Sequence, residues 1–149
     1  MNDYGPLAAR LASLAEGDPG REVCGFVAAD ASGDLSVVPA RNVAREGRVA
    51  FVADPAVHLA LARRLRSEGG RIAAVFHSHL DGPARLSPAD LDGALDGGAP
   101  VFPGVDQIVL GMEAGKVTEI KVFTWGMSGF AVAATLPGPL ARRVATGAR

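Results

Sequence analysis

The segment RIAAVFHSHLDGPARLSPAD, residues 71–90, decides the fold of this chain. It opens with RIAAVF, a nearly uninterrupted apolar run that is typical of a β-strand covered on both faces. The run ends at a pair of histidines, His77 and His79, with one serine between them. DGPAR then breaks regular structure, and Ser87 and Pro88 supply the N-cap and the first-turn proline of a helix. The segment therefore predicts a buried strand, a loop and a short helix.

The sequence on either side of this segment predicts a mixed sheet with flanking helices. Leu7, Leu11 and Leu14 recur at spacings of four and three residues, as in an amphipathic helix that ends at Gly17. We further expect a hairpin over 23–29 and 35–40, a helix from Pro55 capped by Asp54 and ended by Gly69-Gly70, a helix from Ser87 to about Asp96, a Gly/Pro-rich loop over 97–104, and strands over 105–112, 116–125 and 129–136. These elements predict an α/β fold with a mixed β-sheet.

Length and composition fit one globular domain, which we expect to span residues 1–149 with a flexible tail over 141–149. The chain has 149 residues, 48% of them apolar, which is enough to bury a core. Fifteen basic and sixteen acidic residues give a net charge of −1, which disfavours binding to nucleic acid or an anionic membrane. One cysteine excludes an internal disulfide and every cysteine-rich zinc site. With no leader signal and no apolar run near ~18 residues, we expect a cytoplasmic protein.

The two histidines and a downstream aspartate form a candidate metal site. Side chains two residues apart on a strand point the same way, so His77 and His79 can direct their imidazoles at one spot. Asp90 stands in the first turn of the next helix, and the seven residues between His79 and Ser87 let the chain fold back. Two nitrogens and one oxygen, with a fourth position open, are the ligands of a catalytic zinc. The pattern His-x-His-x7-Ser-x2-Asp is expected by chance in roughly two of ten thousand chains of this composition.

This pattern resembles the signature of the JAMM (MPN-plus) metalloproteases, His-Ser/Thr-His-x7-Ser-x2-Asp. The upstream REVCGF, residues 21–26, matches the early strand that carries a glutamate in bacterial and archaeal members. The resemblance runs from about Glu22 to Trp125 and leaves little room for long insertions, so the chain looks like a minimal prokaryotic member. It implies a mixed sheet with packed helices, similar to the cytidine deaminase fold.

The resemblance also implies a mechanism and a substrate. Residues matching His77, His79 and Asp90 bind zinc, the one matching Glu22 transfers protons, and the one matching Ser87 helps to hold the oxyanion. The implied activity is a peptidase or isopeptidase that cleaves after the C-terminal Gly-Gly of a ubiquitin-like or sulfur-carrier protein. The bond type, linear or isopeptide, stays open, as does the oligomeric state.

One position departs from the family pattern. Proline usually follows the second histidine, whereas Leu80 follows His79 here. Leucine does not restrict the backbone as proline does. We therefore expect the exit of the loop to be less fixed than usual.

Each candidate residue also has a structural interpretation. Glu22 could form a buried salt bridge with an arginine, because an unpaired carboxylate at the start of an apolar strand is costly. Asp90 could serve only the helix N-terminus, and Ser87 could act only as an N-cap. Cys24 has no partner that would activate it and is interpreted as a small core residue. The cluster Arg63, Arg64 and Arg66 fits a solvated helix face or a docking patch for an acidic partner.

Other functions are compatible with parts of the pattern. A catalytically silent MPN-type scaffold that binds protein partners is the main alternative, although scaffold relatives typically lose the metal ligands that this chain keeps. An Fe(II) oxygenase is disfavoured because the remaining histidine, His58, precedes the pair. A zinc deaminase is disfavoured because Pro-Cys-x-x-Cys is missing.

Overall fold

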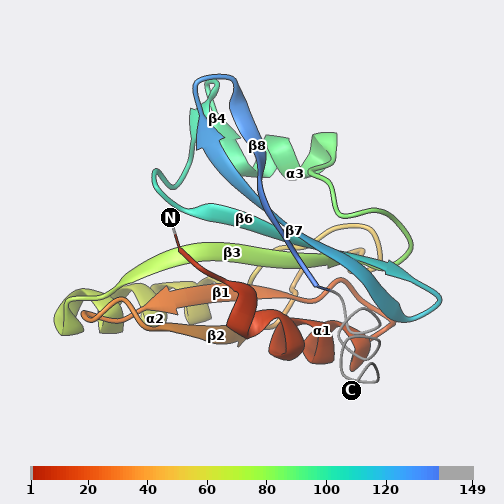
Figure 1. Ribbon diagram of the computed structural model, residues 1–149, viewed down its shortest axis with the longest axis horizontal. Coiled ribbons are helices and arrows are strands. Elements are labelled where there is room, and N and C mark those ends of the chain that lie inside the picture. The colour runs from red at the N-terminus through yellow and green to blue at the C-terminus, as the bar shows by residue number, and fades with distance from the viewer. Residues whose placement is uncertain (1, 138–149) are drawn as a thin grey trace, which may run out of the picture.

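The computed structural model describes residues 2–137, in which a six-stranded sheet forms the centre of the fold (Figure 1). In chain order the elements are η1 (Gly5–Leu7), α1 (Ala8–Glu16), β1 (Cys24–Ala29), β2 (Leu35–Ala40), α2 (Pro55–Glu68), β3 (Arg71–His79), α3 (Pro88–Ala94), β4 (Leu95–Asp96), β5 (Ala99–Pro100), β6 (Asp106–Glu113), β7 (Lys116–Gly126) and β8 (Gly129–Leu136). The strand order is β2-β1-β3-β6-β7-β8, and β4 pairs only with β5. The predicted helices and strands are thus present.

The sheet is mixed, as predicted. β3 runs antiparallel to β1 and parallel to β6, while β6, β7 and β8 form an antiparallel meander. A parallel pair requires a crossover connection, and the chain between β3 and β6 contains α3 and the β4–β5 hairpin. This crossover leads the chain from the end of β3 directly into α3.

Helices cover both faces of the sheet. Val27 of β1 packs into one core with Leu11 of α1, and the neighbouring Phe26 packs into a second core with Leu65 of α2. Successive side chains on a strand point to opposite faces, so β1 contributes to both cores. The run RIAAVF of β3 is mostly buried, which confirms that this strand is covered on both faces.

The end of α3 differs from the prediction. The helix ends at Ala94 rather than near Asp96, because Leu95 adopts an extended backbone and pairs in β4. Gly97 and Gly98 both have positive φ, as a type I′ two-residue hairpin requires. Part of the segment expected to be a Gly/Pro-rich loop is therefore a short hairpin.

Two predictions about the whole chain are not tested by this structure. The expected tail over 141–149 lies outside the described residues, and the single domain over 1–149 stays a prediction. Among residues 2–137, no helix is both long and apolar enough to cross a membrane. The cytoplasmic location also stays a prediction.

Candidate metal centre

The two histidines occupy the last three positions of β3 together with Ser78. β3 extends through His79, so both rings project from regular strand. His77 is fully buried and pairs in register with Cys24 of β1 on one side and Val109 of β6 on the other. The Nε2 atoms of His77 and His79 lie 3.1 Å apart. The structure thus brings together the pair that the spacing predicted.

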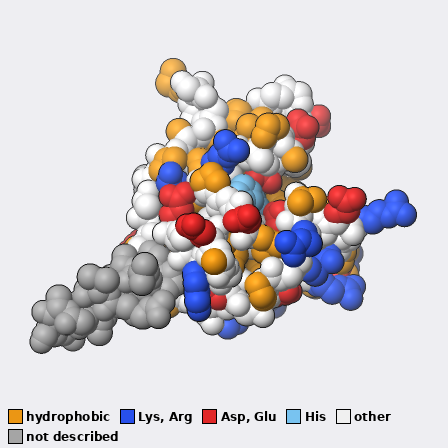
Figure 2. Space-filling model, turned by 90° about the vertical axis from the view of Figure 1, so that its right-hand side faces the viewer, with side chains coloured by type: hydrophobic (Ala, Val, Ile, Leu, Met, Phe, Trp, Pro, Cys, Tyr) orange, Lys and Arg blue, Asp and Glu red, His pale blue; other side chains and the backbone are white. Residues whose placement is uncertain are grey.

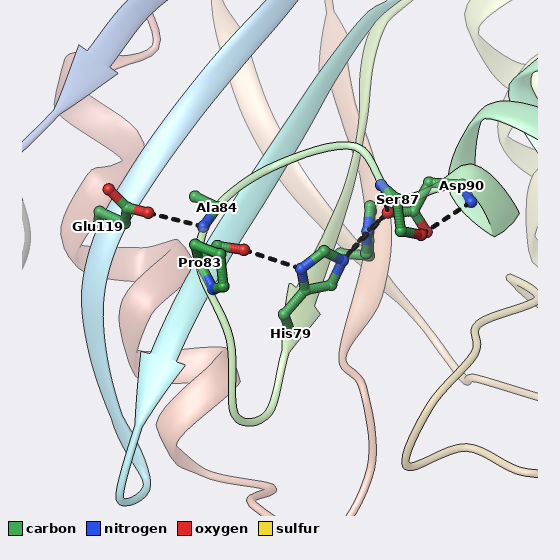
Figure 3. Close-up of polar contacts among 7 residues, drawn as sticks. His79, Pro83, Ala84, Ser87, Asp90 and Glu119 are labelled. Carbon is green, nitrogen blue, oxygen red and sulfur yellow. Dashed lines mark hydrogen bonds and ion pairs between the residues drawn. The ribbon is translucent and has the colours of Figure 1, made fainter.

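Asp90 meets both histidines from the first turn of α3. Ser87 and Asp90 form a capping box: Ser87 Oγ accepts a hydrogen bond from the Asp90 N–H, and Asp90 Oδ2 accepts one from the Ser87 N–H. The same Oδ2 lies 3.1 Å from each of the two histidine Nε2 atoms (Figure 3). The N-cap that starts the helix therefore also orients the carboxylate toward the imidazoles.

The three donor atoms have a spacing that suits a tetrahedral metal ion. Two imidazole nitrogens and one carboxylate oxygen form a triangle with 3.1 Å edges. Zinc binds such atoms at ~2.0–2.2 Å, which places tetrahedral ligands roughly 3.3 Å apart. His79 also has the hydrogen-bond partner usual for a metal-binding histidine, since its Nδ1 lies 2.9 Å from the Pro83 carbonyl oxygen. The residues fit zinc in both atom type and spacing.

Glu22 stands beside this triangle, two residues before β1 begins. It is 5% exposed, and one of its carboxylate oxygens lies within 4.8 Å of ligand atoms of His77 and His79. Within residues 2–137 it forms no ion pair with lysine or arginine. Arg21 instead donates to the carbonyl oxygens of Asn42 and Ala44. The interpretation of Glu22 as a buried salt-bridge residue is therefore not supported in the described part of the chain.

Comparison with known families agrees with this geometry. The family model described as prokaryotic homologues of the JAB domain matches residues 5–125. This chain belongs to that family. The predicted resemblance to JAMM proteins is thereby confirmed, and the matched range contains every residue of the candidate centre.

Two curated relatives are similar to parts of this JAB domain. A desampylase from Haloferax volcanii is 34% identical over 82 residues, which span 54% of this chain and 59% of the relative. A probable TtuB-protein conjugate cleaving protease from Thermus thermophilus is 40% identical over 55 residues, or 37% of each chain. The matches thus cover less than two thirds of either relative.

Solved structures share the fold of this JAB domain. The solution structure of a protein from Desulfitobacterium hafniense has a TM-score of 0.64 and 23% identity, and it covers 88% of this chain and 86% of its own. A protein from Salinibacter ruber has a TM-score of 0.61 and 20% identity over 93% of both chains. At these identities the comparison shows the fold alone, and it confirms the predicted fold class.

Electrostatics within the JAB domain favour a cation at the triangle. Burial disfavours ionisation of Asp90, but its contacts with His77 and His79 outweigh burial and hold its pKa well below the ordinary range. Burial lowers the pKa of His77. Burial acts in the same direction on His79, but Asp90 and the Pro83 carbonyl raise its pKa overall. Asp90 therefore presents an ionised carboxylate beside the imidazole nitrogens.

The pKa of Glu22 is shifted in the opposite direction from that of Asp90, although the two carboxyl groups belong to the same site. Burial raises the pKa of Glu22 to about 7, the charge of His79 lowers it and that of Asp90 raises it. No backbone N–H or arginine compensates the cost of burying its charge within the described residues. A carboxyl group with this pKa can both accept and release a proton near neutral pH.

Three residues make contacts at the centre that were not predicted from the sequence. Ser78, between the histidines, accepts a hydrogen bond from the Val23 N–H through its Oγ and donates its own N–H to the Val23 carbonyl oxygen. Phe51 stacks on His77 with ring centroids 4.3 Å apart. Asn42 is buried and donates to the Glu22 carbonyl oxygen. Of these residues, only Ser78 could have been identified from the sequence, because it occupies the Ser/Thr position of the family signature.

A groove leads away from the centre. A cavity of about 340 Å³ lies between the segment 49–53 and α3, with Asp90 in its lining. A second cavity of about 460 Å³ shares Phe26, His58 and Phe102 with the first, so the two are adjacent. Figure 2 faces the end of the sheet where β3 ends and shows histidine at the surface, with acidic side chains around it and hydrophobic and basic ones farther out. The centre is therefore accessible from a mostly apolar groove.

Proposed function

We propose that this protein is a zinc-dependent peptidase or isopeptidase that hydrolyses the bond after the C-terminal Gly-Gly of a ubiquitin-like or sulfur-carrier protein. The observation that carries the proposal is the triangle of His77, His79 and Asp90 with the buried carboxyl group of Glu22 beside it. Membership in the JAB-domain family supports it.

His77, His79 and Asp90 are the proposed zinc ligands. When bound, the ion supplies a water of lowered pKa, near ~7, and polarises a carbonyl oxygen. Asp90 suits the third position better than Glu22, because its Oδ2 is 3.1 Å from both nitrogens. Its carboxylate is also held in place by the backbone N–H of Ser87.

Glu22 is the proposed general base and general acid. It accepts a proton from the attacking water and returns that proton to the departing amine. Its pKa of about 7 suits both steps at neutral pH. Its position near the histidines, within 4.8 Å, places it close enough to act through one water.

Ser87 is proposed to donate a hydrogen bond to the oxyanion of the tetrahedral intermediate. Its Oγ already accepts the Asp90 N–H as the N-cap, and a hydroxyl that accepts at its oxygen still has its own proton to donate. The two roles of Ser87 are thus compatible. A preorganised donor of this kind is worth ~10²–10³ in rate.

The substrate class rests on the groove and on the relatives. Two glycines carry no side chains, so a Gly-Gly tail can enter a narrow path to the centre, and the apolar cavities can hold the residues that precede it. The two relatives are named for the removal of protein conjugates. A ubiquitin-like partner, held by shape and by its tail, is consistent with both observations.

The test combines metal analysis with cleavage. We expect stoichiometric zinc in the purified protein and cleavage of a ubiquitin-like protein that ends in Gly-Gly, supplied both as a linear fusion and as a lysine conjugate. Glu22→Gln should keep its zinc and lose ~10²–10⁴ of its activity, because only proton transfer is removed. Glu113→Gln, at an exposed position, is the matched control and should be fully active.

Each other outcome has a defined meaning. Protein without zinc, or a Glu22→Gln variant as active as the parent, would contradict the mechanism. Zinc-loaded protein that binds the ubiquitin-like partner without cleaving either linkage would identify the alternative, a silent MPN-type scaffold.

A further inference from the structure

The loop between β3 and α3 holds a contact chain that ends on His79. Nδ1 of His79 lies 2.9 Å from the Pro83 carbonyl oxygen. A carbonyl can only accept, so this contact places the ring proton on Nδ1 and leaves the Nε2 lone pair facing Asp90 and His77. The position of one carbonyl group therefore selects the histidine tautomer that can bind a metal.

The same peptide group is held from its other side. The Pro83 carbonyl and the Ala84 N–H belong to one planar peptide unit, so fixing the direction of the N–H also fixes the direction of the carbonyl. The Ala84 N–H donates to Oε1 of Glu119 over 2.7 Å. Figure 3 shows Glu119, Ala84, Pro83 and His79 in line across this unit.

Charge strengthens this arrangement. A hydrogen bond from an amide to a carboxylate is stronger than one to a neutral acceptor. It also polarises the peptide group, which makes the carbonyl on the far side a better acceptor. Ala84 is 1% exposed, so water has little access to its N–H, although the Glu119 side chain is 32% exposed. Glu119 thus acts on His79 without touching it.

The loop approaches the sheet closely enough for this contact only because of a glycine. A Cβ on Gly111 of β6 would lie 2.7 Å from the Ala84 nitrogen and 3.0 Å from the Gly82 carbonyl oxygen. Gly111 is also the register partner of Glu119 on β7. Next to it, Gly82 and Met112 exchange two backbone hydrogen bonds of 3.1 Å. The loop is therefore joined to the sheet beside Glu119.

We propose that Glu119 is a positioning residue for the metal centre, which sets the orientation and tautomer of His79 through the Pro83–Ala84 peptide group. The proposal rests on the proposed function only in assigning His79 as a ligand. It also accounts for Leu80, since a loop that is fixed by the sheet and by Glu119 does not need proline after the second histidine. Leu80 instead packs against the main core.

The experiment compares three variants in two measurements that need no substrate. Glu119→Ala removes the acceptor, Glu119→Gln keeps an acceptor but loses the charge, and Lys121→Ala removes only the 3.7 Å ion pair to Oε2 of Glu119. Zinc affinity is measured by competition with a chelating dye. The tautomer of His79 in zinc-free protein is measured by ¹H–¹⁵N NMR of the imidazole rings, at a pH high enough for the ring to be neutral.

We expect Glu119→Ala to bind zinc ~10-fold more weakly, the lower end of what loss of a supporting contact costs, and to lose the Nδ1–H signature of His79. Glu119→Gln should keep most of the zinc affinity and most of the Nδ1–H signal of His79. Lys121→Ala should equal the parent in both measurements. Unchanged affinity and tautomer in Glu119→Ala would overturn the proposal, as would equal losses in Lys121→Ala.

Two provisions keep this test decisive. If Glu119→Ala does not fold, Gly111→Ala displaces the same peptide group by steric contact and should give the same NMR change. If the parent binds zinc but cleaves no ubiquitin-like protein, the proposed substrate fails while the role of Glu119 is still measured by affinity and tautomer.

Discussion

Two irregular segments flank the candidate metal centre, residues 41–54 and 80–87, and they are held by different means. In the first segment, the side chain of Asn42 donates to the carbonyl oxygens of Glu22 and Ala50 and accepts the N–H groups of Ala44 and Val52. The side-chain amide of Asn42 thus forms hydrogen bonds with backbone groups that a neighbouring strand would otherwise bind.

The second segment is held by the sheet. It shares backbone hydrogen bonds with Met112, donates to the carboxylate of Glu119, and ends in the capping box of α3. The first segment contributes shape to the site, through Phe51 on His77 and the cavity lining. The second contributes Ser87, the proposed oxyanion donor, and the Pro83 carbonyl oxygen that contacts His79. The first segment is thus attached to itself and to the residues just before β1, whereas the second is attached to β6, β7 and α3.

The largest expected effect comes from removing the Asn42 side chain, which makes four hydrogen bonds to backbone groups in and beside the first segment. Asn42→Ala should lower the free energy of unfolding by about 3 kcal/mol, because it leaves the buried Glu22 carbonyl and three partly buried backbone groups without this partner. Urea denaturation of the zinc-free protein measures this. Asn42→Asp, which keeps the acceptor but loses both donors, should fall between Asn42→Ala and the parent. A loss below ~1 kcal/mol in Asn42→Ala would contradict this and show that Arg21 and the backbone contacts hold the segment without Asn42.

The second segment can be broken at its cap in a way that separates stability from catalysis. Ser87→Gly should cost only a few tenths of a kcal/mol of stability, since glycine is tolerated at N-caps, whereas Ser87→Ala should cost about 1 kcal/mol. Both should lower kcat by ~10²-fold if Ser87 stabilises the oxyanion. Steady-state kinetics with zinc-saturated enzyme measure kcat. Full activity in Ser87→Gly would show that Ser87 acts only as an N-cap and does not stabilise the oxyanion.

The smallest effect is expected in the sheet behind both segments. Cys24 is fully buried, and burial together with the charge of Glu22 raises its thiol pKa to about 11, against a smaller opposing effect of Arg21. The thiolate fraction at pH 8 is therefore far below that of a free cysteine, and a thiol reagent should react only after the chain unfolds. Cys24→Ala should keep activity within about twofold of the parent. Rapid labelling of the folded protein would contradict this.

The proximity of His77, His79 and Asp90 could be predicted from the sequence because its signals are local. His77 and His79 share a face through the period of two on a strand, and Ser87 with Asp90 follows helix-capping rules over three residues. The hairpin of β1 and β2 and the long α2 also have local signals, in turn residues and caps. The pairing register of β1 with β2 and β3 then brings these local elements together.

The remaining contacts could not be predicted because they join distant parts of the chain. Glu119 and Ala84 are 35 positions apart, and no periodicity links an exposed-looking glutamate on one strand to a loop peptide. Asn42 lies in a segment without a helix or strand pattern, so nothing in the sequence indicated that its side chain is buried. The expectation that Leu80 leaves the loop exit less fixed considered the backbone of one residue alone, whereas the structure shows attachment from the neighbouring strands.

The paired hydrogen bonds between Ser78 and Val23 have a consequence for how such a site can change over time. They tie the residue between the histidines to the neighbour of Glu22, so the spacing between Glu22 and the histidines depends on strand register. Register changes only in whole residues, and one step would turn every side chain to the opposite face. That spacing cannot drift by small increments, whereas the flanking segments can lengthen, shorten or change composition. Changes in the flanking segments can therefore alter the rim of the groove while the spacing at its centre stays the same.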